Sequence, residues 1–95
     1  MVRDLPAIEL LEALHRFPCS YMFKVIGRAD AGFVARVVAA VREELACNAD
    51  PPYRVRQAAG GRHVAITLEP QVQTGHQVLA VYRRIQGLTG LVMLL

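Results

Sequence analysis

The chain has 95 residues, of which 54% are hydrophobic and 20% are charged. This composition predicts one globular domain over residues 1–95, and the length excludes a catalytic domain joined to a separate regulatory one. Eleven basic and eight acidic residues give a formal net charge of +3. Such a small excess is typical of a solvated surface and argues against a dedicated nucleic-acid binder. The apolar runs are far shorter than the ~20 residues of a membrane span, so we expect no contact with a membrane.

The N-terminal segment and the cysteines predict a cytoplasmic protein. Asp4, Glu9 and Glu12 interrupt the apolar core that a signal peptide requires. Cys19 and Cys47 are too few for a disulfide framework and match no zinc-binding spacing. Reduced thiols are typical of the cytoplasm. We therefore expect a cytoplasmic protein. Because no zinc-binding spacing is present, we also expect no metal, and we expect no cofactor.

The first elements are a short helix and a strand. Apolar residues spaced three apart predict a helix over residues 5–15, within an N-terminal extension of residues 1–16. Phe17-Pro18 ends this helix, because proline disfavours helical backbone at the preceding residue. A strand follows over residues 20–28, where aromatic and β-branched residues are frequent. Its alternation places one set on the core face (Tyr21, Phe23 and Val25) and another on the opposite face (Met22, Lys24 and Ile26).

The middle of the chain predicts an amphipathic helix and a hairpin. Apolar residues recur at spacings of three and four over residues 31–46, and Asp30 is a suitable N-cap for that helix. Tyr53 to Gln57 alternates in polarity and predicts the second strand. Gly60-Gly61 then predicts the turn of a β-hairpin, which leads into a third strand over residues 62–68.

A second helix and a last strand complete the pattern. Residues 71–86 carry an apolar stripe of helical period, with Gly75 weakening its first turn. Residues 91–95 are apolar at every position, which predicts a strand covered on both faces. The order β-α-β-β-α-β predicts an α+β, ferredoxin-like sandwich with a four-stranded antiparallel sheet and two helices on one face.

No catalytic constellation emerges from the sequence, and we expect the protein not to be an enzyme. The turn Gly27–Asp30, with Arg28 and Arg36 beside it, loosely resembles the phosphate loop of acylphosphatases, which share the expected fold. Those enzymes need an asparagine on the next strand, and Tyr53 to Gln57 contains none. Asp30 would also place a negative charge where the phosphate should bind.

The sheet face without helices is the most informative surface. Its expected side chains combine positive charge with apolar ground (Met22, Lys24, Ile26, Arg54 and Arg56), with Ala65 and either Arg62 or His63 beside them. Such a surface suits a small anionic ligand, a protein partner or a second copy of the chain. An RNA reader would need exposed aromatic residues on the central strands, and the third strand has none. An interaction module would be disrupted by a charge at Ile26 or Leu94.

The assembled pattern resembles the YbeD-like family of small, largely uncharacterised bacterial proteins. The resemblance rests on Phe17-Pro18 with the segment Tyr21 to Gly27, on the Gly61 turn with Val64 to Thr67, and on Val78 and Tyr82 before the apolar ending. It implies a ferredoxin-like fold similar to the ACT-type regulatory domains of amino-acid enzymes. It also implies a regulatory protein that binds lipoate, and it brings no catalytic residues.

From this resemblance we expect a non-enzymatic regulatory or binding domain that is oligomeric. A small carboxylate such as lipoate or an amino acid would bind at the Gly27–Asp30 turn or on the open sheet face. The alternative is a module for protein interaction or oligomerisation without a small-molecule ligand. The N-terminal extension is longer than in the family, and we expect it to pack on the sheet edge or on a neighbouring molecule.

Overall fold

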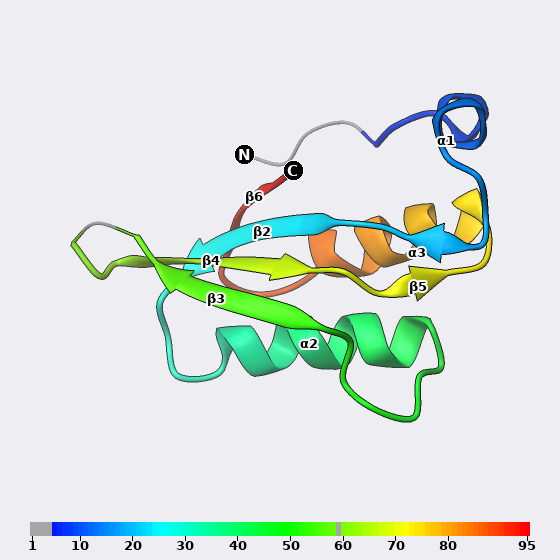
Figure 1. Cartoon of the computed structure of the whole chain (residues 1–95). Coiled ribbons are helices and arrows are strands. Elements are labelled where there is room, and N and C mark those ends of the chain that lie inside the picture. Colours follow the sequence, from blue (N-terminus) through cyan, green and yellow to red (C-terminus); the bar gives the residue numbers. More distant parts are fainter. Residues whose placement is uncertain (1–4, 59) are drawn as a thin grey trace.

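The computed structural model describes residues 5–58 and 60–95 and contains three helices and six strands among them (Figure 1). Their bounds are, in chain order, α1 Ile8–Leu14, β1 Cys19–Ser20, β2 Phe23–Arg28, α2 Phe33–Glu44, β3 Tyr53–Gln57, β4 His63–Leu68, β5 Gln71–Val72, α3 Gly75–Gln86 and β6 Leu91–Leu94. Residues 1–4 of the predicted extension lie outside the described residues. No helix among the described residues is long and apolar enough to cross a membrane.

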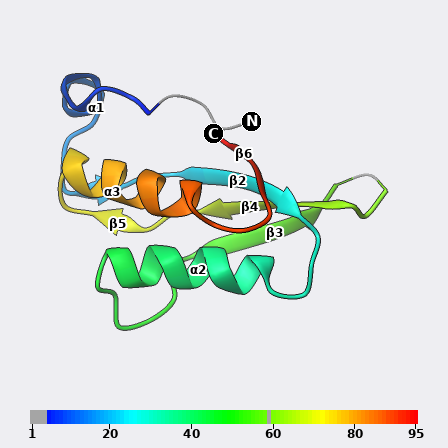
Figure 2. The same ribbon diagram turned by 180° about the vertical axis from the view of Figure 1, so that it is seen from behind.

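The main sheet has the strand order β3-β4-β2-β6, and every neighbouring pair is antiparallel. Helices α2 and α3 lie side by side along one face of this sheet, as both ribbon views show (Figure 2). Arg84 of α3 joins the two helices through ion pairs to Glu43 and Glu44 of α2. This arrangement confirms the expected ferredoxin-like sandwich. The additional strands β1 and β5 pair only with each other among the described strands.

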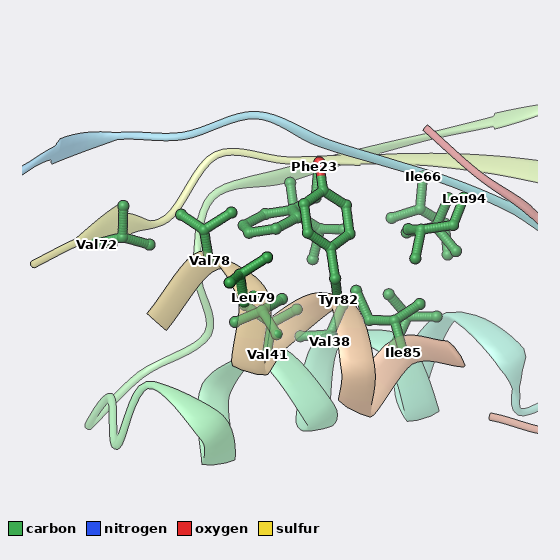
Figure 3. Packing of buried hydrophobic residues seen from close by; sticks show 14 of the residues in the cluster. Phe23, Val38, Val41, Ile66, Val72, Val78, Leu79, Tyr82, Ile85 and Leu94 are labelled. Carbon is green, nitrogen blue, oxygen red and sulfur yellow. The ribbon is translucent and has the colours of Figure 1, made fainter. Parts of the chain in front are cut away.

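The core lies between the sheet and the two helices (Figure 3). Phe23 and Val25 of β2 point into it, as the alternation of the strand predicts, and both are fully buried. Phe23 packs against Tyr82 of α3, with 5.1 Å between the ring centroids. Tyr21 extends this cluster through a hydroxyl–hydroxyl hydrogen bond of 3.1 Å to Tyr82. Burial of apolar side chains such as these is a main source of stability in a domain of this size.

Helices α2 and α3 begin later than the sequence predicts. Residues 71–72 form strand β5, and the Thr74 side chain accepts a hydrogen bond from the Gln77 N–H to begin α3 four residues later than expected. Helix α2 begins at Phe33 with Gly32 as its N-cap, so Asp30 is not the cap that the sequence predicted.

The last strand also differs from prediction. Strand β6 lies at the sheet edge, where only one of its faces is covered by helices. Leu94 is buried against the core, whereas Met93 and Leu95 are 37% and 42% exposed on the other face. The sequence suggested burial of both faces because every residue is apolar. Hydrophobic side chains are not restricted to the interior, and here alternate ones line the open face.

Helix α1 packs on the N-terminal end of α3, whereas the expected positions were the sheet edge or a neighbouring molecule. Leu11 is its buried anchor. Gly75 allows the close approach, because a Cβ atom there would lie 2.7 Å from Cδ1 of Ile8. Gly75, which was expected to weaken the first turn of α3, is therefore the residue on which α1 packs.

Leu11→Ala is expected to lower the free energy of unfolding by about 2 kcal/mol, because it removes the buried anchor of α1. The matched control is Leu10→Ala on the same helix, where the side chain is 52% exposed, and its effect should stay within about 0.5 kcal/mol. Chemical denaturation of both variants measures the difference. Equal effects would show that Leu11 does not anchor the helix.

Candidate functional site

The open face of the sheet presents side chains in ordered rows across the four strands. One row runs from Arg54 through Thr67 and Lys24 to Leu95, because Arg54 and Lys24 both pair with Thr67 and the Leu95 N–H donates to the Lys24 carbonyl. The next row runs through Arg56, Ala65, Ile26 and Met93. Residues directly opposite in an antiparallel pair share one face, so these side chains form one surface.

A shallow hollow of about 570 Å³ lies over these rows. The residues that line it are Lys24, Val25, Ile26, Arg54, Val55, Arg56, Ala65, Ile66, Thr67 and Leu95. The small side chains Ala65 and Thr67 on the central strand β4 leave the space, and longer side chains on the neighbouring strands surround it. Four of the five candidate residues from the sequence therefore meet at one site: Lys24, Ile26, Arg54 and Arg56.

Met22 is the exception among the candidate residues. It precedes β2, is exposed, and does not line the hollow. The predicted strand over residues 20–28 is interrupted at residues 21–22, so the alternation does not extend to this position. Leu94, which we expected on the same face, points into the core. Sequence reasoning missed Thr67 and Leu95 at the hollow and Met93 beside it. The alternation of β4 could have identified Thr67, whereas residues 91–95 are all apolar and give no such sign.

The hollow is positively charged at its β3 side. Arg54 makes one ion pair, 3.3 Å from its Nη1 to Oε1 of Glu69, and both side chains are exposed, so this pair contributes little to stability. Lys24 and Arg56 have no ion-pair partner within the part of the chain that the structure describes. Two unneutralised cations and one weakly paired arginine therefore surround the same space.

The opposite side of the hollow is mainly apolar, with Lys24 of β2 as the charged residue among those that line it. Ile26 of β2 and Leu95 after β6 provide its surface, and Met93 continues it at the sheet edge. Strands in a sheet are about 4.8 Å apart, so the distance from β3 to β6 is about 14 Å. The surface thus changes from cationic to apolar over a length comparable to that of a medium-chain carboxylate.

The turn after β2 contains an anionic side chain, Asp30, whose carboxylate is bound within the turn itself. The Asp30 Oδ1 atom accepts a hydrogen bond from the Gly32 N–H at 2.8 Å, and Oδ2 lies 2.9 Å from Nη2 of Arg36. The Gly32 N–H and the Arg36 guanidinium lower the pKa of Asp30. Arg36 also donates to the Thr89 carbonyl at 3.1 Å. Because the Asp30 carboxylate occupies these donors, the geometry favours the open sheet face over the turn as a ligand site.

Lowering the pH should loosen this turn. Asp30 has a folded-state pKa below its ordinary 3.8, so it stabilises the fold above that value and loses this contribution as the pH falls through the lowered folded pKa. Asp30→Asn should therefore flatten the acid limb of the stability profile while changing little at pH about 7 beyond the loss of the Arg36 pair. Urea denaturation at a series of pH values measures this. An unchanged acid limb in the variant would contradict it.

The remaining reactive side chains do not assemble into a site. Among residues 5–58 and 60–95, no three His, Cys, Asp or Glu side chains lie close enough to hold a metal ion. Cys19 and Cys47 are half-buried free thiols. Arg28 and His63 pair across β2 and β4 beyond the hollow, and neither lines it.

Comparison with known proteins places this chain in a family. Residues 12–95 match a family described as "Protein of unknown function (DUF493)". The chain belongs to this family. A UPF0250 protein of Shewanella woodyi is 32% identical over 79 residues, which cover 83% of this chain and 88% of that protein. The UPF0250 protein of Nitrosomonas europaea is 25% identical over 84 residues, covering 88% and 97%.

A third relative, the UPF0250 protein of Paraburkholderia phytofirmans, is 28% identical over 76 residues, covering 80% of this chain and 85% of that protein. These bacterial relatives confirm the resemblance to the YbeD-like family. The DUF493 match begins at residue 12, inside α1, and it contains all four strands of the main sheet. The open face therefore belongs to the part of the chain that the family shares.

Proposed function

We propose that this protein is a non-catalytic binding domain that holds a small carboxylate with an apolar chain in the hollow of its open sheet face. Lipoate is the candidate that the family resemblance suggests. The observation that carries the proposal is the polarity of the hollow, which is cationic at Arg54 and Arg56 and apolar at Ile26 and Leu95. Ligand sites commonly combine an apolar surface with a few charged groups that fix orientation.

The carboxylate head is placed on β3. Arg54 and Arg56 lie two positions apart on one face of the strand, so their guanidinium groups reach the same region of the hollow. Guanidinium groups bind carboxylates through paired, charge-assisted hydrogen bonds. Lys24, two strands away, adds a third positive charge. The apolar chain then lies over Ala65 and Ile26 and ends at Leu95 and Met93.

Binding without turnover fits the chemistry of the lining. The residues that line the hollow include no histidine and no carboxylate to serve as a general base. The role that we propose is regulatory, as the resemblance to ACT-type domains suggests. The free thiols Cys19 and Cys47 agree with the cytoplasmic location that forms part of this proposal.

The exposure of Met93 and Leu95 favours a second candidate function. In this alternative the same face binds a second copy of the chain or a protein partner, and no small molecule is needed. Ile26→Glu tests it, since a charge on the apolar half would abolish concentration-dependent association measured by sedimentation velocity. A wild-type protein that stays monomeric at all concentrations would contradict the self-association form.

A titration followed by two-dimensional NMR tests the main proposal. Lipoate and octanoate should give saturable shifts in the amides of β2, β3 and β4. Octan-1-ol, which has the chain without the charge, should bind at least about tenfold more weakly, because a hydrogen bond to a charged group contributes about 1.5–3 kcal/mol. Octylammonium should not bind. No shifts with octanoate at millimolar concentration, or equal binding of octanoate and octylammonium, would contradict the proposal.

A further inference from the structure

Strand β3 forms one edge of the main sheet, and its backbone is open to solvent. Among the described strands it pairs with β4 alone. All of its residues, Tyr53 to Gln57, are exposed. An edge strand carries a row of unpaired N–H and C=O groups, which is a template for the addition of another strand.

The hydrogen-bonding register identifies the groups that face outward. The Ala58 N–H donates to the His63 carbonyl, and the Glu69 N–H donates to the Pro52 carbonyl. In an antiparallel ladder, residues at alternate positions bond to the same neighbour. Arg54 and Arg56 therefore bond to β4, and the N–H and C=O groups of Tyr53, Val55 and Gln57 point away from the sheet.

The side chains of β3 alternate between two kinds of surface. Arg54 and Arg56 lie on the open face, where Arg56 makes no ion pair with the described residues. Tyr53 and Val55 lie on the face that the helices cover elsewhere, yet they remain 44% and 47% exposed. A partner strand in register would meet positive charge on one face and apolar side chains on the other.

We infer that β3 accepts an extended segment of another protein whose residues alternate between acidic and apolar. Its backbone would bond to the outward groups of β3, its carboxylates would face Arg54 and Arg56, and its apolar side chains would cover Tyr53 and Val55. Strand addition of this kind combines affinity from the main chain with specificity from alternate side chains.

Charge argues for such a partner over a second copy of the chain. A copy paired antiparallel through β3, with the two open faces on the same side, would place Arg54 opposite Arg54 or Arg56 of the other copy. Like charges directly opposite on neighbouring strands are destabilising. Two arginines on an exposed edge thus disfavour self-pairing and favour acidic segments.

The inference goes beyond the proposed function, because it depends on the outward backbone of β3 and the proposed ligand depends on the hollow. The two share Arg54 and Arg56. The two are therefore separated on the unaltered protein, where octanoate binding tests the hollow and peptides with blocked N–H groups test the outward backbone of β3.

The test uses the full chain and the peptide acetyl-Thr-Val-Glu-Val-Glu-Val-Thr-amide. Hydrogen exchange followed by NMR should show new protection of the Tyr53, Val55 and Gln57 amides, with those of Arg54 and Arg56 unchanged because β4 already holds them. A peptide with lysine in place of both glutamates should not bind. Absence of binding at millimolar peptide, or protection confined to other elements, would overturn the inference.

Two N-methylated peptides test the backbone contacts on the unaltered protein. Methyl groups on the valine nitrogens block the N–H groups that face β3 in antiparallel pairing, and methyl groups on the glutamate nitrogens block those that face it in parallel pairing. One methylated peptide should bind at least about tenfold more weakly than the parent peptide. The other should bind with about the same affinity as the parent peptide. Equal affinity of both methylated peptides and the parent would overturn strand addition.

Val55→Pro provides the matching change in the protein. Proline is tolerated on an edge strand where the missing N–H faced solvent. The variant should lose about tenfold or more in peptide affinity while it keeps the NMR spectrum of a folded protein. If peptide binding is unchanged in a folded variant, the inference is wrong; if only octanoate binding fails in the unaltered protein, the proposed function alone is wrong.

Discussion

Gly27→Ala is expected to lower the free energy of unfolding by about 3 kcal/mol, at the upper end of overpacking effects. A Cβ atom at Gly27 would overlap the ring of Phe33, which is fully buried at the start of α2. The ring cannot turn toward solvent without exposing the core, so the strand and the helix must separate. Thermal unfolding should show a decrease in Tm of more than about 10 °C.

Gly87→Ala is the matched control for this change. Gly87 has a φ of −85°, and a Cβ there would make an ordinary contact of 3.7 Å with the Arg84 carbonyl oxygen. Its effect should stay within about 1 kcal/mol. The double variant Gly27→Ala with Phe33→Leu should recover part of the loss, since the smaller side chain makes room. Equal Tm values for the two glycine variants would refute close packing at Gly27.

Reversing both charges on β3, in Arg54→Glu with Arg56→Glu, is expected to lower the affinity for octanoate by more than about a hundredfold. Each arginine would lose a charge-assisted hydrogen bond worth about 1.5–3 kcal/mol, and each new glutamate would repel the ligand. Both positions are exposed, so the fold should be retained. Isothermal titration calorimetry measures the change in affinity.

The control for this double variant is Arg16→Glu with Arg83→Glu. These arginines are also exposed and lie away from the hollow, so the change in net charge is the same. Octanoate affinity should remain within about threefold of the unaltered protein at moderate ionic strength, because charges beyond a Debye length are screened. If both double variants weaken binding equally, only the net charge matters and the β3 site is wrong.

The sequence predicted the sandwich because periodicity determines its main elements. The alternation in β2 and the helical stripe of α2 each specify one face, and a one-residue error would have turned Phe23 or Phe33 toward solvent. Features that depend on long-range partners were beyond such reasoning. Pairing of Cys19-Ser20 with Gln71-Val72, and docking of α1 on Gly75, are contacts between distant segments.

The candidate site could be predicted in part from the alternation of side chains along each strand. Lys24 and Ile26 follow from the alternation that buries Phe23 and Val25, and the arginines of β3 follow in the same way. This alternation gives no prediction where the regular strand is interrupted, as at Met22. It also gives no prediction in β6, because every residue there is apolar and the composition does not indicate that Leu94 is the buried one.

The most direct test of the central claim is a measurement of intermolecular NOEs between octanoate and the methyl-labelled protein. A carboxylate site on the open sheet face predicts NOEs from the terminal methyl group of octanoate to the methyl groups of Ile26, Met93 and Leu95. It also predicts that the protons next to the carboxylate lie near Arg54 and Arg56. NOEs from the terminal methyl group to the turn around Asp30, or to the helices, would contradict a carboxylate site on the open sheet face.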